Sequence, residues 1–240
     1  MKKPLRHHAL TSLLFLLTML LATACTNNGK YEVREGKVYY TYWTWSFGPQ
    51  EYELEDADAS SFESIKDWAG RDDQHVWFKQ RLVKGADPAS IEVEDYPLLY
   101  DKHDYYYKGA ALGVKDMATF RIKKCNDDEL WATDNRYIYF DSLRIEGSDP
   151  ATFEYLEFFE AKDRLHVYYF GHILEEADPE TYEVMGNYAR DKQHVFYCGH
   201  IVEGADPATL EVEQKFELNK PDAKDKNNYY RNGEVFKYNK

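Results

Sequence analysis

The feature that most constrains this chain is an internal repeat that recurs five times with a fixed internal spacing. Each copy starts at an aspartate, continues into aromatic or β-branched residues and reaches a second aspartate 15 positions later, usually followed by proline. Successive copies are 29, 33, 29 and 28 residues apart, so length changes fall between units and not inside them. This pattern is typical of an array that stacks one supersecondary unit. The first aspartates are Asp72, Asp101, Asp134, Asp163 and Asp191, and the second ones are Asp87, Asp116, Asp149, Asp178 and Asp206.

Each unit has the pattern of a β-hairpin followed by a capped turn. In residues 167–174, aromatic and β-branched residues flank Phe170-Gly171, which predicts a two-residue turn and pairs Tyr168 with Ile173. The Asp-Pro segments predict a short helical turn, capped by Asp and with Pro in its first position. The alternating stretch after each turn predicts a third short strand. We therefore expect an all-β fold of tandem repeats of about 29 residues, each a hairpin or meander, forming either a curved repeat sheet or a propeller-like array.

Degenerate copies flank the regular units. The segment Asp225–Tyr230 reads Asp-Lys-Asn-Asn-Tyr-Tyr, and here the chain resembles the bacterial DKNYY family. The resemblance implies bacterial origin and envelope placement, and it brings no assigned activity. It divides the mature chain into a degenerate N-terminal repeat, the core repeats and a truncated C-terminal capping repeat, at residues 36–67, 68–214 and 215–240.

The N-terminus predicts export. Residues 1–24 have a basic start and an uncharged apolar run that is short for a bilayer-spanning helix, which is the pattern of a signal peptide. The run ends in small residues followed by Cys25, which resembles a lipobox with Cys25 as the acylated residue. Ordinary signal peptidase is the alternative, and both cut before Cys25. Residues 25–35 are then a linker from the lipid anchor.

The charge of the mature chain limits its partners. After removal of three basic residues with the signal, 27 Lys and Arg stand against 43 Asp and Glu, a net charge of −16. Such a surface repels phosphate backbones and anionic headgroups, so nucleic-acid binding is disfavoured and the membrane is held through the lipid on Cys25. Sorting rules place the protein at the outer membrane, facing the periplasm.

One stretch in the first unit is a candidate binding platform. Trp43, Trp45 and Phe47 alternate along an expected strand, which would place them on one face. Exposed aromatic side chains on a strand suit an envelope protein or cell-wall glycan. The alternative is that they cap the core.

Other chemistry-bearing residues fit the architecture better than a site. Cys125 and Cys198 could form a disulfide in an oxidising compartment, or remain free and half-buried. His166 and His194 share one repeat position, where we expect pairing with Glu175 and Glu203 instead of a metal. The recurring Asp-Pro aspartates give too few ligands for calcium. No catalytic, cofactor or metal motif is present, so we expect a non-enzymatic binding or scaffolding lipoprotein. The alternatives are an inhibitor of a periplasmic toxin and a hydrolase with dispersed residues.

Overall fold

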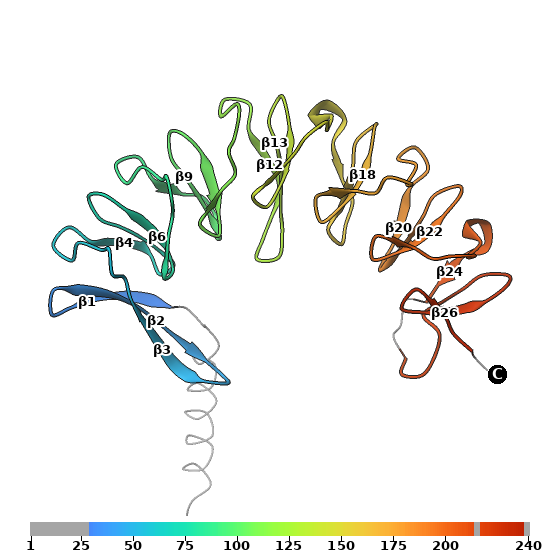
Figure 1. Cartoon of the computed structure of the whole chain (residues 1–240), viewed down its shortest axis with the longest axis horizontal. Helices are drawn as coiled ribbons and strands as arrows, with labels where there is room; N and C mark the ends of the chain where they lie inside the picture. The colour runs from blue at the N-terminus through green and yellow to red at the C-terminus, as the bar shows by residue number, and fades with distance from the viewer. Residues whose placement is uncertain (1–28, 214–216, 238–240) are drawn as a thin grey trace, which may run out of the picture. The chain divides into compact units, whose positions relative to one another are not determined.

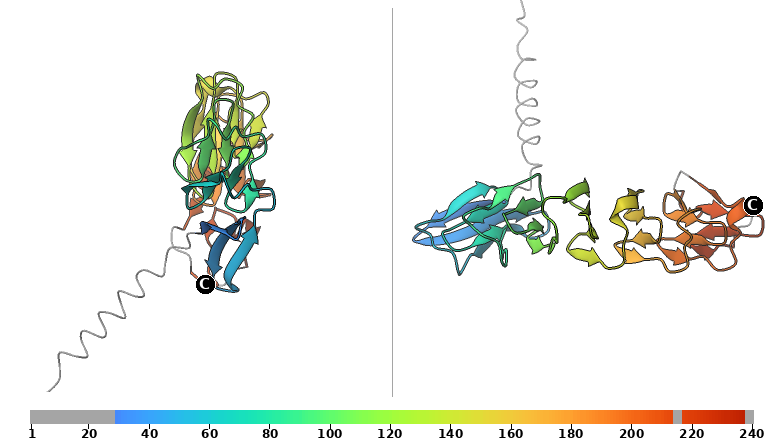
Figure 2. Two further views of the ribbon diagram at one scale, coloured as in Figure 1. Left: turned by 90° about the vertical axis from the view of Figure 1, so that its left-hand side faces the viewer. Right: turned by 90° about the horizontal axis from the view of Figure 1, so that it is seen from above.

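The computed structural model describes residues 29–213 and 217–237 as small antiparallel sheets that follow one another along the chain (Figures 1 and 2). The chain divides into two compact units. Unit 1 ends at Val93, and unit 2 begins at Glu94. Within the described ranges, no helix has the length and apolar character needed to cross a bilayer.

Unit 1 holds a three-stranded sheet and then a four-stranded one, both with neighbouring strands in chain order. The first strand begins at Lys30, so part of the stretch 25–35 belongs to a sheet and the prediction of a linker there is wrong for residues 30–34. Their strands are β1 (Lys30–Arg34), β2 (Lys37–Thr44), β3 (Gly48–Glu53), β4 (Glu63–Lys66), β5 (Ala69–Arg71), β6 (Val76–Phe78) and β7 (Arg81–Leu82). A further short strand, β8 (Glu92–Val93), ends the unit.

Unit 2 begins with the antiparallel strands β9 (Leu98–Tyr100), β10 (Tyr105–Tyr107) and β11 (Ala110–Ala111). Four complete four-stranded sheets follow, and the last one is not truncated as the sequence predicted. Their strands are β12 (Arg121–Cys125), β13 (Leu130–Thr133), β14 (Ile138–Phe140), β15 (Leu143–Ile145); β16 (Glu154–Tyr155), β17 (Glu160–Lys162), β18 (Val167–Tyr169), β19 (His172–Ile173); β20 (Glu183–Met185), β21 (Tyr188–Arg190), β22 (Val195–Tyr197), β23 (His200–Ile201); β24 (Glu211–Val212), β25 (Ala223–Lys224), β26 (Tyr229–Arg231) and β27 (Glu234–Val235).

The predicted all-β repeat array is confirmed, but each regular sheet has four strands and not three. The additional strand precedes the motif: β17 pairs with β18 on one side and β16 on the other. Three residues are too few to show a period of two, which is why the pattern does not reveal this strand. The predicted hairpin register is confirmed, since Tyr168 pairs with Ile173.

The first aspartate of each motif is a buried junction. At Asp163, Oδ1 accepts hydrogen bonds from the backbone N–H groups of Leu165 and His166, at 2.7 and 2.8 Å. Oδ2 accepts from the Tyr168 hydroxyl and from the backbone N–H of Asp149, both at 2.6 Å. Burial acts to raise the pKa of Asp163, but these donors outweigh it and lower the pKa. One carboxylate thus fixes its own loop, its strand and the turn that leads out of the preceding sheet. Equivalent bonds to loop N–H groups and to the preceding turn occur at Asp72, Asp134, Asp191 and Asp225.

Two Asp-Pro segments form the predicted short helical turns, and of these Asp149 has the predicted side-chain cap whereas Asp206 has none. Pro150–Thr152 and Pro207–Thr209 are short 3₁₀ helices, and the Asp149 side chain accepts from the N–H of Ala151. The Thr152 hydroxyl oxygen in turn accepts from the N–H of Arg164 in the next motif. The turn is therefore bound to the loop of the following sheet.

Candidate functional site

The predicted platform lies at the tip of the β2–β3 hairpin in unit 1. Residues 45–47 form the turn, so Trp45 and Phe47 do not alternate along a strand with Trp43, and the single-face prediction is wrong. The exposed fractions of Trp43, Trp45 and Phe47 are 43%, 75% and 80%. The alternative, that these rings cap the core, is therefore wrong for Trp45 and Phe47. The rings of Trp43 and Trp45 meet edge to face, with centroids 4.7 Å apart.

Hydrogen bonds hold the tip in one conformation. The Thr44 hydroxyl accepts from the N–H of Phe47 at 3.1 Å and donates to the carbonyl of Gly48 at 3.3 Å. The Gln50 side-chain amide donates to the carbonyl of Phe47. Gly48 has a φ of +69°, which glycine adopts without strain. The exposed rings are thus presented by a well-bonded turn.

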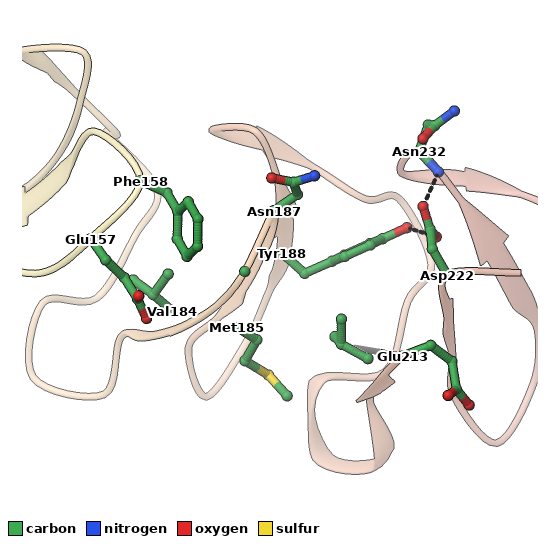
Figure 3. A pocket seen from close by; sticks show the side chains of 11 residues that line it. Glu157, Phe158, Val184, Met185, Asn187, Tyr188, Glu213, Asp222 and Asn232 are labelled. Carbon is green, nitrogen blue, oxygen red and sulfur yellow. Dashed lines mark hydrogen bonds between the residues drawn. The ribbon is translucent and has the colours of Figure 1, made fainter. Parts of the chain in front are cut away.

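A second candidate site is an open cavity of about 650 Å³ in unit 2 (Figure 3). Its volume lies in the range of small-ligand pockets. Its lining comes from the turns and strand ends of the last three sheets, and includes no lysine or arginine. The lining residues are Glu157, Phe158, Val184, Met185, Gly186, Asn187, Tyr188, Val212, Glu213, Asp222 and Asn232.

One wall of the cavity is a closed hydrogen-bond network. The Tyr188 hydroxyl donates to Oδ1 of Asp222 at 2.7 Å and accepts from the N–H of Gly233 at 3.0 Å. Oδ2 of Asp222 accepts from the N–H of Asn232 at 2.8 Å (Figure 3). Burial and the neighbouring Asp222 carboxylate raise the pKa of Tyr188. Because both Asp222 oxygens have donors, this wall is a fixed support.

The mouth of the cavity is formed differently. Phe158 is half exposed, and both Phe158 and Phe159 have left-handed φ angles, +52° and +68°. Left-handed backbone costs roughly 1–2 kcal/mol for a residue with a Cβ, and clusters of such residues are common at functional sites. The Glu157 and Glu213 carboxylates are exposed and make no hydrogen bond or ion pair with the described part of the chain. One sequence feature distinguishes this part of the lining. At the turn position where the next sheet has Gly186-Asn187, this sheet has Phe158-Phe159.

The family model of the DKNYY family matches residues 17–110 and 99–234. The chain belongs to the DKNYY family. Searches of curated proteins and of solved structures gave no significant match for this DKNYY protein. The family assignment therefore confirms the repeat and leaves the activity open.

A buried carboxyl that the DKNYY repeat pattern does not reveal lies between the sheets β16–β19 and β20–β23. Glu160 is 2% exposed, and neither its Oε2 nor the buried Tyr182 hydroxyl has a hydrogen-bond partner among the described residues. Burial raises the pKa of Glu160 to about 7. The corresponding position holds Tyr188 in the next sheet and Trp131 in the preceding one, so only a repeat alignment identifies the acid as an exception.

The remaining predicted site residues of the DKNYY chain are not brought together. Cys125 and Cys198 are both free and half-buried, on different sheets, so the structure has the free-thiol alternative and no disulfide between them. Burial raises the pKa of Cys125 to about 11. Cys25, the predicted acylation site, lies outside the described residues.

The histidines contact a different carboxylate from the one expected. Nδ1 of His166 lies 3.9 Å from Asp163, and Nδ1 of His194 lies 3.6 Å from Asp191. Each partner is the motif aspartate three residues earlier, and not Glu175 or Glu203 across the hairpin. Among the described residues, no group of three His, Cys, Asp or Glu side chains is placed to bind a metal.

Proposed function

We propose that this DKNYY protein is a non-enzymatic, lipid-anchored binding protein of the bacterial envelope, and that its unit 2 cavity takes a basic segment of an envelope protein. The signal-like N-terminus and Cys25 support export and anchoring. The repeat units support a scaffolding role, because their recurring polar groups are used in hydrogen bonds between consecutive elements.

The observation that carries this proposal is that exposed carboxylates and apolar side chains line the same cavity. Val184, Met185 and Val212 line the same cavity as Glu157 and Glu213. A lysine or arginine side chain has the matching distribution, with an aliphatic stem that packs on apolar surface and a cationic end that seeks carboxylates.

The aromatic ring at the mouth and the protein charge favour the same ligand. Phe158 also lines the cavity (Figure 3), and the face of an aromatic ring can interact with a cation. The mature chain carries a net charge of −16, from 27 basic and 43 acidic residues, so long-range attraction favours a basic partner and opposes an anionic one.

The test is binding of a short lysine-rich peptide to the mature chain, measured by calorimetry, with the same peptide acetylated on its lysines for comparison. We expect the lysine peptide to bind, more weakly as salt rises, and acetylation to remove binding. Glu157→Gln/Glu213→Gln should weaken binding about tenfold or more, because two charge pairs are lost. The matched control is Glu175→Gln/Glu203→Gln, which makes the same charge change at exposed carboxylates outside the cavity lining.

Two outcomes contradict the proposed ligand. One is equal binding of the acetylated peptide, and the other is equal loss of binding in the control variant, which would indicate charge attraction without a site. A neutral cell-wall oligosaccharide that binds the cavity and ignores the Glu157→Gln/Glu213→Gln change would favour a glycan receptor.

The anchor is tested separately by growth with a labelled fatty acid. Wild type should incorporate the label, and Cys25→Ser should not. Absence of label in wild type would leave a secreted binding protein.

A further inference from the structure

The tip of the β2–β3 hairpin is both apolar and uncharged. Residues 42–50 contain no charged side chain, whereas 30% of all residues in the chain are charged. Trp45 and Phe47, exposed by 75% and 80%, are the most exposed aromatic residues of the described chain. Neighbouring exposed aromatic side chains with no charge among them are typical of an interaction site.

The opposite end of the same sheet has a different character. There the β1–β2 turn is flanked by Arg34 and Lys37, and these side chains form ion pairs with Glu51 and Glu53 of β3. The sheet is therefore polar at one end and aromatic at the other, a distribution that suits an element with one end in water and one in a less polar medium.

The strand register places the start of the folded chain toward the aromatic end. Lys30 pairs with Thr41, and Thr44 pairs with Gly48 across the turn. The tip thus extends about four residues, or roughly 13 Å, beyond the level at which the chain enters the sheet. Cys25 precedes Lys30 by five residues, a reach of up to about 17 Å. A lipid on Cys25 would hold the aromatic end of the sheet close to the surface of the same membrane.

We propose that Trp43, Trp45 and Phe47 form a second membrane contact, which inserts into the headgroup region of the bilayer that holds the lipid anchor. Aromatic side chains are favoured at the membrane–water interface. Bonds within the turn satisfy both the N–H and the carbonyl of Phe47, which lowers the cost of moving the turn into a less polar region. The orientation rests on the proposed lipid anchor, whereas the affinity of the tip for lipid does not.

The experiment uses the full mature chain carrying Cys25→Ser, which has no acyl chain, and vesicles of zwitterionic phosphatidylcholine. These vesicles avoid repulsion between anionic lipid and the acidic protein. Sedimentation measures partitioning, and quenching by lipids brominated near the headgroup measures insertion of tryptophan. We expect partitioning with quenching of Trp43 and Trp45, since Trp77 and Trp131 are buried and Trp68 is only partly exposed.

The variant Trp45→Ala/Phe47→Ala should lower the partition coefficient by about tenfold or more, because it removes the two most exposed rings. Trp45→Tyr/Phe47→Tyr, which keeps the rings, should retain most of the partitioning. The controls are Val33→Ala at the other end of the same sheet and Leu218→Ala in unit 2, both exposed apolar residues. They should partition like the parent chain, and circular dichroism should show that all variants fold.

No partitioning of the parent chain, or partitioning that the Trp45→Ala/Phe47→Ala change leaves intact, overturns the proposal. Loss of binding to isolated cell wall on the same change, without any binding to vesicles, would identify a glycan contact in its place. Because this chain carries no lipid, failure here is distinct from failure of the fatty-acid labelling test.

Discussion

The two ends of a single sheet in this protein are built by opposite rules. In the sheet β16–β19, one end is closed by Asp163, whose two oxygens accept four hydrogen bonds. At the other end, Phe158 and Phe159 have left-handed backbone, and the Glu157 carboxylate lacks a partner among the described residues. β17, three residues long, separates these ends.

This difference separates architecture from function. A buried charge is stable only when its hydrogen-bonding capacity is filled, so the aspartate end tolerates little change and recurs along the chain. The other end, which holds the turns and is called here the turn end, is solvated and free to vary. This freedom allows single sheets to carry an aromatic tip or a cavity mouth. Recurrence of a polar residue is here a sign of structure, and departure from the repeat is the sign of a site.

The strongest test of this contrast is Asp163→Ala. We expect a loss of about 3–5 kcal/mol in the free energy of unfolding of unit 2, because several donors, two of them in the loop, lose a charged acceptor. Glu157→Gln at the turn end should change it by less than about 0.5 kcal/mol. Urea denaturation measures both, and similar losses for the two variants would remove the distinction between the ends.

The buried Glu160 predicts a pH dependence that the aspartate junctions do not share. Its pKa is raised from 4.5 to about 7 in the folded state, so folding favours the protonated form. The free energy of unfolding that depends on Glu160 is highest below about pH 4.5, where the carboxyl is protonated in both the folded and the unfolded state. It falls as the pH rises toward 7, where it is lower by on the order of 3 kcal/mol. Glu160→Gln should remove this decline while leaving stability at pH 4.5 nearly unchanged. Denaturation curves for both chains from pH 4.5 to 8 check it, and parallel pH profiles would contradict it.

Much of the fold was predictable because it rests on local patterns. The Asp-to-Asp spacing, the Phe170-Gly171 turn and the Asp-Pro caps each encode a backbone conformation within a few residues. The strand β17 was not predictable in this way, since its hydrogen-bonding partners on both sides define it more than its three residues do.

The sites were less predictable for the same reason. Trp45 and Phe47 stand out in the sequence as aromatic residues of an irregular unit, but alternation could not show that they lie in a turn. The cavity depends on the placement of turns from three sheets, and residues such as Phe158 and Glu213 have no shared sequence pattern. At His166 the pattern predicted a contact across the hairpin, but the side chain instead lies near Asp163 in its own loop.

A third prediction concerns where the turn end meets the preceding sheet. Gly171 has a φ of +74°, and a Cβ there would lie 2.7 Å from the Cβ of Phe140. Gly171→Ala should therefore cost about 2–3 kcal/mol, from left-handed strain and from the displaced ring. The matched control is Gly147→Ala, with a φ of +77° and nothing within 4 Å, which should cost only the roughly 1 kcal/mol due to strain. Equal losses in thermal denaturation would show that the turn does not pack against Phe140.

The smallest effect is expected where one aspartate junction is incomplete. Phe196 occupies the position of Tyr168, so Asp191 receives the loop N–H groups and the Asp178 N–H but no hydroxyl. Phe196→Tyr should supply that donor and stabilise unit 2 by about 0.5–1 kcal/mol, because the acceptor is charged and buried. The reverse change, Tyr168→Phe, should destabilise it by at least as much, since Asp163 would lose an existing donor. If Phe196→Tyr instead destabilises the chain while Tyr168→Phe is neutral, the hydroxyl is not part of the junction, and the aspartate end is held by its backbone donors alone.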